Sequence, residues 1–283
     1  MKTIKIAGVP EHFNLPWNLA IDNGDFEKEN IDLQWTDVPE GTGKMCQMLR
    51  DGSTDIAVIL TEGIVKDIVA GNKSKIVQIY VESPLIWGIH VAAKSDYKTL
   101  ADLENKKVAI SRLGSGSQLM AYVNADNQNW KTENLQFEIV NTIDGAVDAL
   151  TSGNADYFMW ERFMTKPLVD NGTFRRIDDC PTPWPCFVIA VRDEVIENDP
   201  TIISKILSVI NQTTEDFKDI PSIDKSLASN YNQKTEDIKE WLSLTHWSQK
   251  SLAPQMLNKV QNQLLQLKII DKKGTFEDIV KTV

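Results

Sequence analysis

The stretch Leu49-Arg50-Asp51-Gly52-Ser53-Thr54-Asp55-Ile56-Ala57 has a counterpart further along the chain, Leu150-Thr151-Ser152-Gly153-Asn154-Ala155-Asp156-Tyr157-Phe158. Both follow the pattern Leu-x-x-Gly-x-x-Asp-apolar, and the leucine, glycine and aspartate are each displaced by 101 residues. This pattern is typical of a helix end, a tight turn at glycine and a buried strand. A repeat at a constant offset indicates that one structural unit occurs twice.

The segments around the two stretches alternate between strand and helix patterns in the same order. Strands are predicted at residues 5–9, 31–35, 55–60, 76–81 and 88–93, and again at 107–111, 137–141, 156–160 and 187–191. Helical patterns separate most of them and fill the chain beyond residue 200. This order is typical of open α/β sheets. We predict two similar α/β lobes with mixed open sheets, joined by a hinge of two strand crossings around a ligand cleft.

The predicted lobe I comprises residues 1–92 and 190–283, and lobe II comprises residues 93–189. The C-terminal helices are expected to cover the existing sheets, most simply the sheet of lobe I, because no third strand-rich unit follows.

Composition excludes several classes of protein. The 283 residues are 42% hydrophobic, enough for a core, and the net charge of −10 argues against a nucleic-acid partner. No apolar run is long enough to span a membrane. The N-terminus enters a strand pattern directly, without a secretory signal. We therefore expect a cytoplasmic protein from the chain as written, or a periplasmic or cell-surface protein if the chain is a trimmed mature form.

The three cysteines, Cys46, Cys180 and Cys186, give neither a disulfide framework nor zinc-ligand spacing. Cys180 and Cys186 could pair, but free buried thiols are the preferred interpretation.

A Gly/Ser-rich turn follows the strand at 107–111 and opens a helix pattern. Such a turn presents backbone N–H groups that can bind an anion or a polar ligand edge. The alternative is an ordinary turn with a serine helix cap. At about the offset of the repeat, residues 108–120 correspond to residues 4–17, so the loop containing Glu11, His12 and Asn14 is the expected counterpart in lobe I.

Several stretches together resemble the type II periplasmic-binding-protein superfamily, and within it the binders of nitrate, aliphatic sulfonates and thiamine pyrimidine precursors. The stretches are Leu49–Ala57, Ser83-Pro84-Leu85, Thr99–Leu103 with Lys107–Ile110, Gly114–Ser117, Asp156–Glu161 and Phe276–Val280. The resemblance implies two α/β lobes that close on a small ligand. Family members that serve transporters carry a signal or lipid anchor, which is not evident at this N-terminus.

Open α/β sheets bind ligands at the carboxyl ends of their strands. This rule, with the aromatic residues nearby, predicts the ligand-binding residues Glu11, His12, Asn14, Gly41, Thr42, Thr61, Glu62, Arg112, Gly114, Ser115, Gly116, Ser117, Trp160, Glu161 and Trp184.

Alternatives stay open for individual residues. Asn14 could cap the following helix, and Arg112 could pair with an acidic residue instead of a ligand anion. Glu62 and Glu161 could stabilise helix N-termini. Trp17 and Trp87 suit core packing at least as well as a site.

We predict a solute-binding protein, most plausibly for a nitrogen heterocycle such as a thiamine pyrimidine precursor, because acidic residues occur with tryptophans. Backbone donors and Arg112 favour the alternative, a sulfonate or another small anion. A second alternative is an enzyme related to thiamine pyrimidine synthesis, and a third is a sensor that signals by lobe closure.

No catalytic Ser/His/Asp order and no nucleotide-binding glycine motif occurs, so we expect no enzyme activity, no cofactor and no metal. The expected partners are the ligand and, if the chain is exported, an ABC transporter permease.

Overall fold

The computed structural model describes residues 1–282, which form two compact units. Unit 1 comprises Met1–Ser83 and the chain from Trp184 onward, and unit 2 comprises Pro84–Pro183. The strand β5 (Ile86–Ala92), assigned to lobe I from the sequence, belongs instead to the sheet of unit 2. The strand β10 (Phe187–Arg192) lies wholly in the sheet of unit 1, although the predicted boundary cuts through it. A local pattern identifies a strand but not the sheet that it joins.

Unit 1 contains a five-stranded mixed sheet in the order β2-β1-β3-β10-β4. Its other strands are β1 (Lys2–Gly8), β2 (Ile31–Asp37), β3 (Ile56–Leu60) and β4 (Ser74–Val81). The strand β1 pairs in parallel with β2 and β3, whereas β10 is antiparallel to both β3 and β4. The carboxyl ends of β1, β2 and β3 therefore meet at one edge of the sheet.

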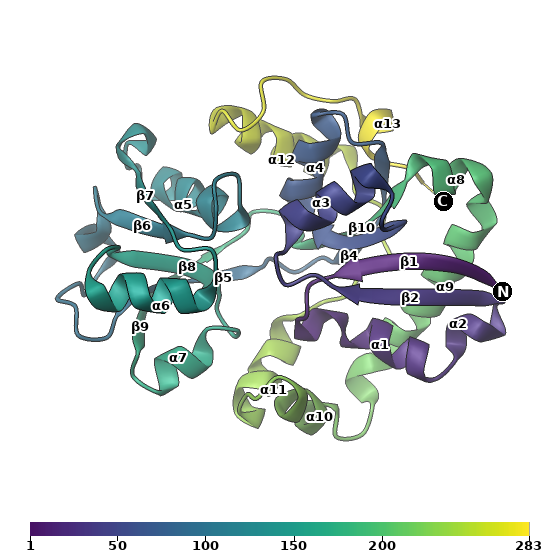
Figure 1. Cartoon of the computed structure of the whole chain (residues 1–283), viewed down its shortest axis with the longest axis horizontal. Helices are drawn as coiled ribbons and strands as arrows, with labels where there is room; N and C mark the ends of the chain where they lie inside the picture. Colours follow the sequence, from purple (N-terminus) through teal and green to yellow (C-terminus); the bar gives the residue numbers. More distant parts are fainter. Residues whose placement is uncertain (283) are drawn as a thin grey trace. The chain divides into compact units, whose positions relative to one another are not determined.

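Helices cover both faces of this sheet, as expected for right-handed crossovers whose strands lie on either side of β1. In Figure 1, α3, α4 and α12 lie on one side of the sheet, and α1, α2 and α9 lie on the other. The helices of unit 1 are α1 (Leu15–Asp22), α2 (Asp25–Lys28), α3 (Thr42–Asp51), α4 (Thr61–Val69), α8 (Asp193–Asn198), α9 (Pro200–Asp216), α10 (Ile223–Asn230), α11 (Thr235–Leu244), α12 (Pro254–Gln266) and α13 (Phe276–Ile279). The C-terminal helices thus cover unit 1, as predicted.

Unit 2 repeats this arrangement with the order β7-β6-β8-β5-β9. Its remaining strands are β6 (Lys107–Ile110), β7 (Gln136–Ile139), β8 (Tyr157–Glu161) and β9 (Phe174–Pro181), and its helices are α5 (Gly116–Asn127), α6 (Ile143–Ser152) and α7 (Lys166–Asp170). The strand β6 is parallel to β7 and β8, and β5 is antiparallel to β8 and β9. The two units therefore share one topology, as the sequence repeat predicted.

The repeated glycines explain why the repeated sequence folds the same way twice. Gly52 ends α3 with φ 76° and ψ 14°, and Gly153 ends α6 with φ 77° and ψ 15°. This left-handed conformation is costly for residues with a Cβ, so glycine at the helix C-terminus allows the sharp turn into the next strand.

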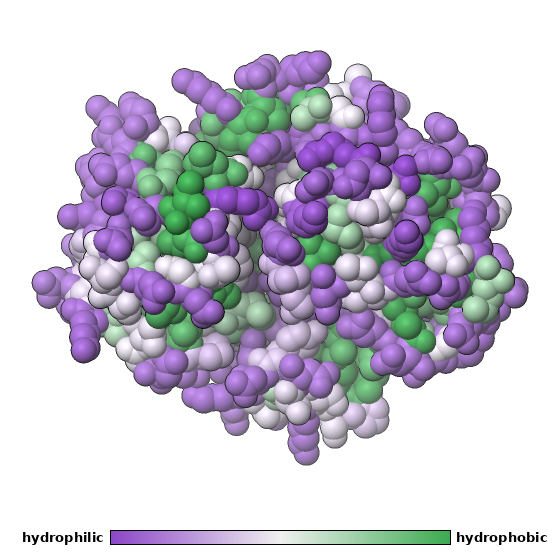
Figure 2. Space-filling view, viewed as in Figure 1, coloured by the Kyte–Doolittle hydropathy of each residue, from purple (hydrophilic) through white to green (hydrophobic). Residues whose placement is uncertain are grey.

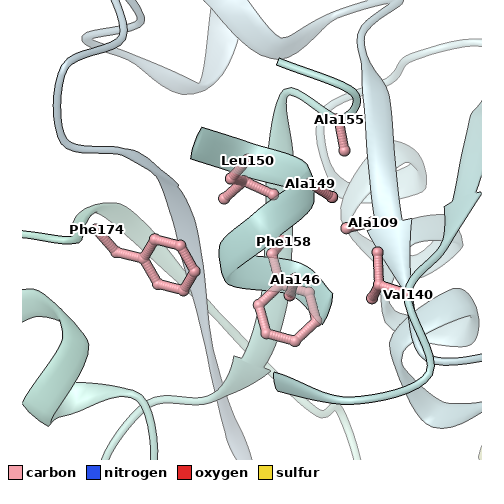
Figure 3. Packing of buried hydrophobic residues seen from close by; sticks show 8 residues of the cluster. All are labelled: Ala109, Val140, Ala146, Ala149, Leu150, Ala155, Phe158 and Phe174. Atoms are coloured by element: carbon pink, nitrogen blue, oxygen red, sulfur yellow. The ribbon is translucent and has the colours of Figure 1, made fainter. Parts of the chain in front are cut away.

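A compact group of apolar residues fills the space between α6 and the sheet of unit 2 (Figure 3). Phe158 of β8 and Phe174 of β9 supply the aromatic volume, and Ala146 and Ala149 let the helix approach closely. Burial of this apolar surface stabilises unit 2 at about 25 cal/mol per Å² removed from water.

Some elements differ from the sequence-based expectations. The strand β9 was not predicted, because Phe174–Pro181 carries two arginines and two aspartates and lacks apolar alternation. Charged residues are typical of an edge strand such as β9, where they disfavour pairing with another chain.

The three cysteines are free and buried, so Cys180 and Cys186 do not pair. Within residues 1–282, no helix has the length and apolar character needed to cross a membrane. The face shown in Figure 2 is mainly hydrophilic, with hydrophobic residues in small groups.

Candidate functional site

The loop after β1 places three predicted site residues at the carboxyl edge of the unit 1 sheet. His12 and Asn14 lie in the 3-10 turn His12–Asn14, and both are buried. Asn14 occupies the N-cap position of α1, as one alternative predicted, but its side chain makes no cap bond. Its amide Nδ2 instead donates to the Val9 carbonyl at 2.8 Å. The Oδ1 atom of Asn14 has no partner within the described chain.

His12 is fully buried and stacks on Trp241, with ring centroids 4.2 Å apart and an interplanar angle of 29°. Tyr231 lies 5.5 Å from His12 between ring centroids. Neither ring nitrogen of His12 has a hydrogen-bond partner among residues 1–282. Burial lowers the pKa of His12 to about 3, so the ring is neutral near pH 7 and carries one donor and one acceptor.

Tyr231 and Trp241 extend the candidate site beyond the sequence prediction. They lie at the end of α10 and on α11, more than 200 residues after His12. Neither residue was among the predicted ligand-binding residues. No local signal could have linked them to the β1 loop, because their contact with His12 depends on the packing of α10 and α11.

Thr61 and Glu62 begin α4 directly after β3 and contact the segment that leads into β10. The Thr61 hydroxyl donates to the Pro185 carbonyl at 2.6 Å, and Trp184 Nε1 donates to Glu62 Oε2 at 2.7 Å. The Trp184 indole is 2% exposed, so it does not present the open aromatic face that the sequence analysis expected. Buried hydrogen bonds to a charged acceptor are among the stronger ones.

Burial raises the pKa of Glu11 to about 7 and of Glu62 to about 7. Water solvates a carboxylate far better than the protein interior does, so removal from water favours the protonated form. The Trp184 indole partly opposes the effect at Glu62. Carboxyl groups with such pKa values are candidates for a functional site.

Gly41 and Thr42 lie at the start of α3, on the loop after β2. The Thr42 methyl group packs against Gly63 so closely that a Cβ on Gly63 would lie 2.2 Å from Thr42 Cγ2. This contact gives Thr42 a packing role between α3 and α4.

In unit 2, the loop after β6 forms a network of serine hydroxyl groups. Ser115 caps α5 by accepting from the Gln118 N–H at 3.3 Å, and Ser117 Oγ accepts from the Ser111 N–H at 3.0 Å. The two hydroxyl oxygens, Ser115 Oγ and Ser117 Oγ, are 3.0 Å apart. The bond from the Gln118 N–H to Ser115 confirms the helix-cap interpretation of this turn. Both serines are buried, and ligand binding by Ser115 and Ser117 stays a prediction.

The rest of this loop is more open. Arg112 and Gly116 are half-buried, Gly114 is exposed with φ 74°, and Leu113 is 66% exposed. Leu113 was not predicted as a site residue. A large apolar side chain exposed at the carboxyl end of a strand suits contact with an apolar part of a ligand.

Glu161 is the last residue of β8, and its side chain bonds to the backbone just after it. Its Oε2 accepts from the backbone N–H groups of Phe163 and Met164, at 2.9 and 2.7 Å. The predicted alternative was stabilisation of a helix N-terminus, but these N–H groups lie in the turn before α7, which begins at Lys166. Trp160 is half-buried, stacks on Phe158 and meets Trp87 edge to face at 6.2 Å between ring centroids.

The structure thus groups the predicted residues in two sets. Unit 1 holds those of the loops after β1, β2 and β3 together with Trp184, and unit 2 holds those of the loops after β6 and β8. A surface hollow beside β7 and α6 contains none of the predicted residues. Within the part of the chain that the structure describes, no group of three His, Cys, Asp or Glu residues could hold a metal ion.

Two units, each with the same five-stranded order and helices around the sheet, define the type II periplasmic-binding-protein fold. The chain therefore has the fold of the type II periplasmic-binding-protein superfamily. Residues 87–180 match the family model described as Ca3427-like PBP.

Solved structures agree with this assignment. The chain is similar to the CA3427 gene product of Candida albicans, described as having the generic periplasmic-binding-protein fold, with a TM-score of 0.90, 25% identity, and coverage of 100% of this chain and 97% of that chain.

It is also similar in fold to the alkanesulfonate-binding protein SsuA of Xanthomonas axonopodis pv. citri bound to MOPS (TM-score 0.85, 15% identity, coverage 100% and 99%). A third similar fold is the aliphatic sulphonate binding protein SsuA of Escherichia coli (0.77, 17%, 100% and 92%). No curated protein matches the sequence significantly.

Proposed function

We propose that this protein is a solute-binding protein that binds one small molecule through the loops at the carboxyl ends of its sheet strands. The observation that carries this proposal is His12. Both of its ring nitrogens are buried in the loop after β1, without a partner in the described part of the chain. A buried polar group left unpaired costs about 1–3 kcal/mol. A ligand that hydrogen-bonds His12 would offset this cost. The superfamily fold and the rule for ligand sites in α/β sheets support the same conclusion.

The preferred ligand is a nitrogen heterocycle similar to a thiamine pyrimidine precursor. A neutral imidazole can donate one hydrogen bond to such a ring and accept another from its amino group. The alternative is a sulfonate or another small anion, which the fold similarity to sulfonate-binding proteins and the position of Arg112 support. We further propose that binding serves transport through an ABC permease and involves no catalysis.

A thermal-shift panel tests this function. It contains aminopyrimidines, alkanesulfonates, nitrate, amino acids and aromatic amidines. A ligand at 100 times its dissociation constant adds about 2.7 kcal/mol to the free energy of unfolding, which raises the melting temperature by several degrees. A panel in which no class of compound raises the melting temperature would contradict the proposal.

A pair of histidine variants assigns the site. His12→Phe keeps an aromatic ring against Trp241 but removes both ring nitrogens, so we expect it to weaken binding of the best ligand. His246→Phe is the matched control, because His246 is exposed in the same unit. Equal affinity in the wild type and both variants would remove His12 from the site.

A further inference from the structure

Two carboxyl groups lie at the carboxyl edge of the unit 1 sheet without a basic partner. Glu11 follows β1, and Glu62 lies in the first turn of α4 and is 2% exposed. Among the described residues, no basic side chain contributes to the pKa of either group. Buried charged groups are normally paired, so the buried Glu62 is unusual. Glu11 is half-buried.

Glu11 follows β1 and Glu62 follows β3. These two strands are parallel neighbours, so both residues lie beyond the same edge of the unit 1 sheet. Both carboxylates raise the pKa of the buried Cys186 thiol, which lies just before β10. Glu11 also acts on Tyr231, together with Asp37 at the end of β2. Every one of these neighbours is neutral or acidic, so the region favours positive charge.

The cations on the helices that surround Glu62 do not neutralise it. Lys44 on α3 and Lys259 on α12 are exposed, and the Lys44 ammonium bonds Gln47. Lys66 on α4 itself is half-buried and does not contribute to the pKa of Glu62. The local charge around the two carboxyl groups is therefore uncompensated within the described chain.

His12 is an independent observation at the same place. It follows Glu11 directly, and both residues interact with Tyr231. Its ring is fully buried and has no hydrogen-bond partner among residues 1–282. A neutral imidazole cannot balance a carboxylate, but it can accept a hydrogen bond from a ligand N–H group.

We propose that the ligand of this site carries a planar organic cation, such as an amidinium or a protonated aminopyrimidine, which Glu11 and Glu62 neutralise. This inference rests on the proposed function and narrows its ligand class. A planar cation with two N–H donors suits a carboxylate bidentately, and the ring of Tyr231 adds an aromatic neighbour. A sulfonate would instead meet two carboxylates and pay for like-charge repulsion.

Three compounds with one ring and different charge test the proposal. Benzamidinium is a planar cation, benzamide is its neutral analogue, and benzenesulfonate is an anion of similar size. We expect benzamidinium at millimolar concentration to raise the melting temperature, and benzamide and benzenesulfonate to leave it unchanged. Stabilisation by benzenesulfonate alone would overturn the proposal and leave the solute-binding function standing. No stabilisation by any organic cation in the panel would also overturn it.

Glutamate-to-glutamine variants test whether Glu11 and Glu62 bind the cation. We expect Glu11→Gln and Glu62→Gln each to weaken benzamidinium binding by about tenfold or more, because a hydrogen bond to a charged group contributes about 1.5–3 kcal/mol. Glutamine preserves the shape and an acceptor for Trp184, so these variants retain the packing. Glu27→Gln removes an exposed charge in α2 of the same unit and should bind as the wild type does. Equal affinity in all four proteins would overturn the proposal.

Proton linkage gives a second readout. A bound cation favours the ionised carboxylates, so binding releases protons wherever the pKa values of Glu11 and Glu62 lie near the working pH. We expect the affinity for benzamidinium to rise as the pH increases through about 7. An affinity that falls over this range would contradict the proposed charge of the ligand.

Discussion

Asp55 and Asp156 make the same pair of hydrogen bonds in the two units. Asp55 Oδ2 accepts from the Lys5 N–H at 2.9 Å, and the Asp55 N–H donates to the Lys5 carbonyl at 2.9 Å. Asp156 Oδ2 accepts from the Lys107 N–H, and the Asp156 N–H donates to the Lys107 carbonyl, both at 2.8 Å. Each aspartate thus fixes the start of its strand against the neighbouring parallel strand.

This equivalence predicts that Asp55→Ala and Asp156→Ala each lower the free energy of unfolding by about 1–2 kcal/mol, because a backbone N–H loses a charged acceptor. Urea unfolding measures the change. Asp22→Ala is the control, because Asp22 is exposed near the end of α1. If both aspartate variants unfold at the same urea concentration as the control, these hydrogen bonds do not contribute to stability.

The close contact between α3 and α4 predicts a rescue experiment. In Gly63→Ala, the new Cβ would lie 2.2 Å from Thr42 Cγ2, so we expect a loss of about 1–3 kcal/mol from overpacking. Thr42→Ser removes that methyl group and should cost little by itself. The double variant should recover most of the loss in urea unfolding. An additive double variant would show that the strain arises elsewhere.

The buried carboxyl of Glu62 predicts a pH-dependent stability. Its pKa rises from 4.5 to about 7 on folding, so the folded state keeps the proton to higher pH than the unfolded state does. The stabilising contribution is complete below about pH 4.5 and is lost as the pH rises to about 7. Relative to Glu62→Gln, the wild type should lose about 3 kcal/mol over this range.

Denaturant unfolding at several pH values measures this difference. His12 and His90 titrate in the opposite sense, because burial lowers the pKa of each, but both are present in the two proteins and cancel. Glu104→Gln, at an exposed site in unit 2, should show a constant difference from the wild type. A constant difference for Glu62→Gln as well would contradict the prediction.

The hydrogen bond from Trp184 to Glu62 predicts coupled variants. Trp184→Phe removes the indole donor and should lower the free energy of unfolding by about 1–3 kcal/mol. It should also raise the pKa of Glu62 further, because the indole opposes the effect of burial. The cost of Trp184→Phe should be smaller in a Glu62→Gln background, where no carboxylate is left without its donor.

Urea unfolding of the two single variants and the double variant, compared with Trp130→Phe in unit 2, gives the coupling energy. Additive effects of the Trp184 and Glu62 substitutions would mean that the bond is energetically unimportant.

Much of the fold could be predicted because its signals are local. Gly52 and Gly153 adopt the left-handed conformation at the end of a helix. Glycine favours this helix end through its own backbone freedom, without contacts to distant residues. Thr99 likewise begins the 3-10 turn Leu100–Leu103 with a capping box that Asp102, three residues later, completes. Alternating strand and helix patterns then indicate the order of elements and, through the repeat, the presence of two units with one fold.

The candidate site was less accessible to sequence reasoning. The rule for carboxyl strand ends located the loops after β1, β3, β6 and β8, but not the partners of their side chains. Ser115 and Ser117 bond to their own loop, and Trp184 is enclosed by its contact with Glu62. Tyr231 and Trp241 reach His12 only through the packing of α10 and α11.

By itself, the sequence determined that two equivalent α/β units exist, where most of their strands and turns lie and which loops follow the strands. These properties depend on periodicity and turn chemistry within a few residues. Only the tertiary structure decided that β5 belongs to unit 2, that β9 completes its sheet, and that Glu62 meets Trp184, 122 residues away. Such contacts depend on which distant segments close on one another, and a local sequence pattern carries no record of that choice.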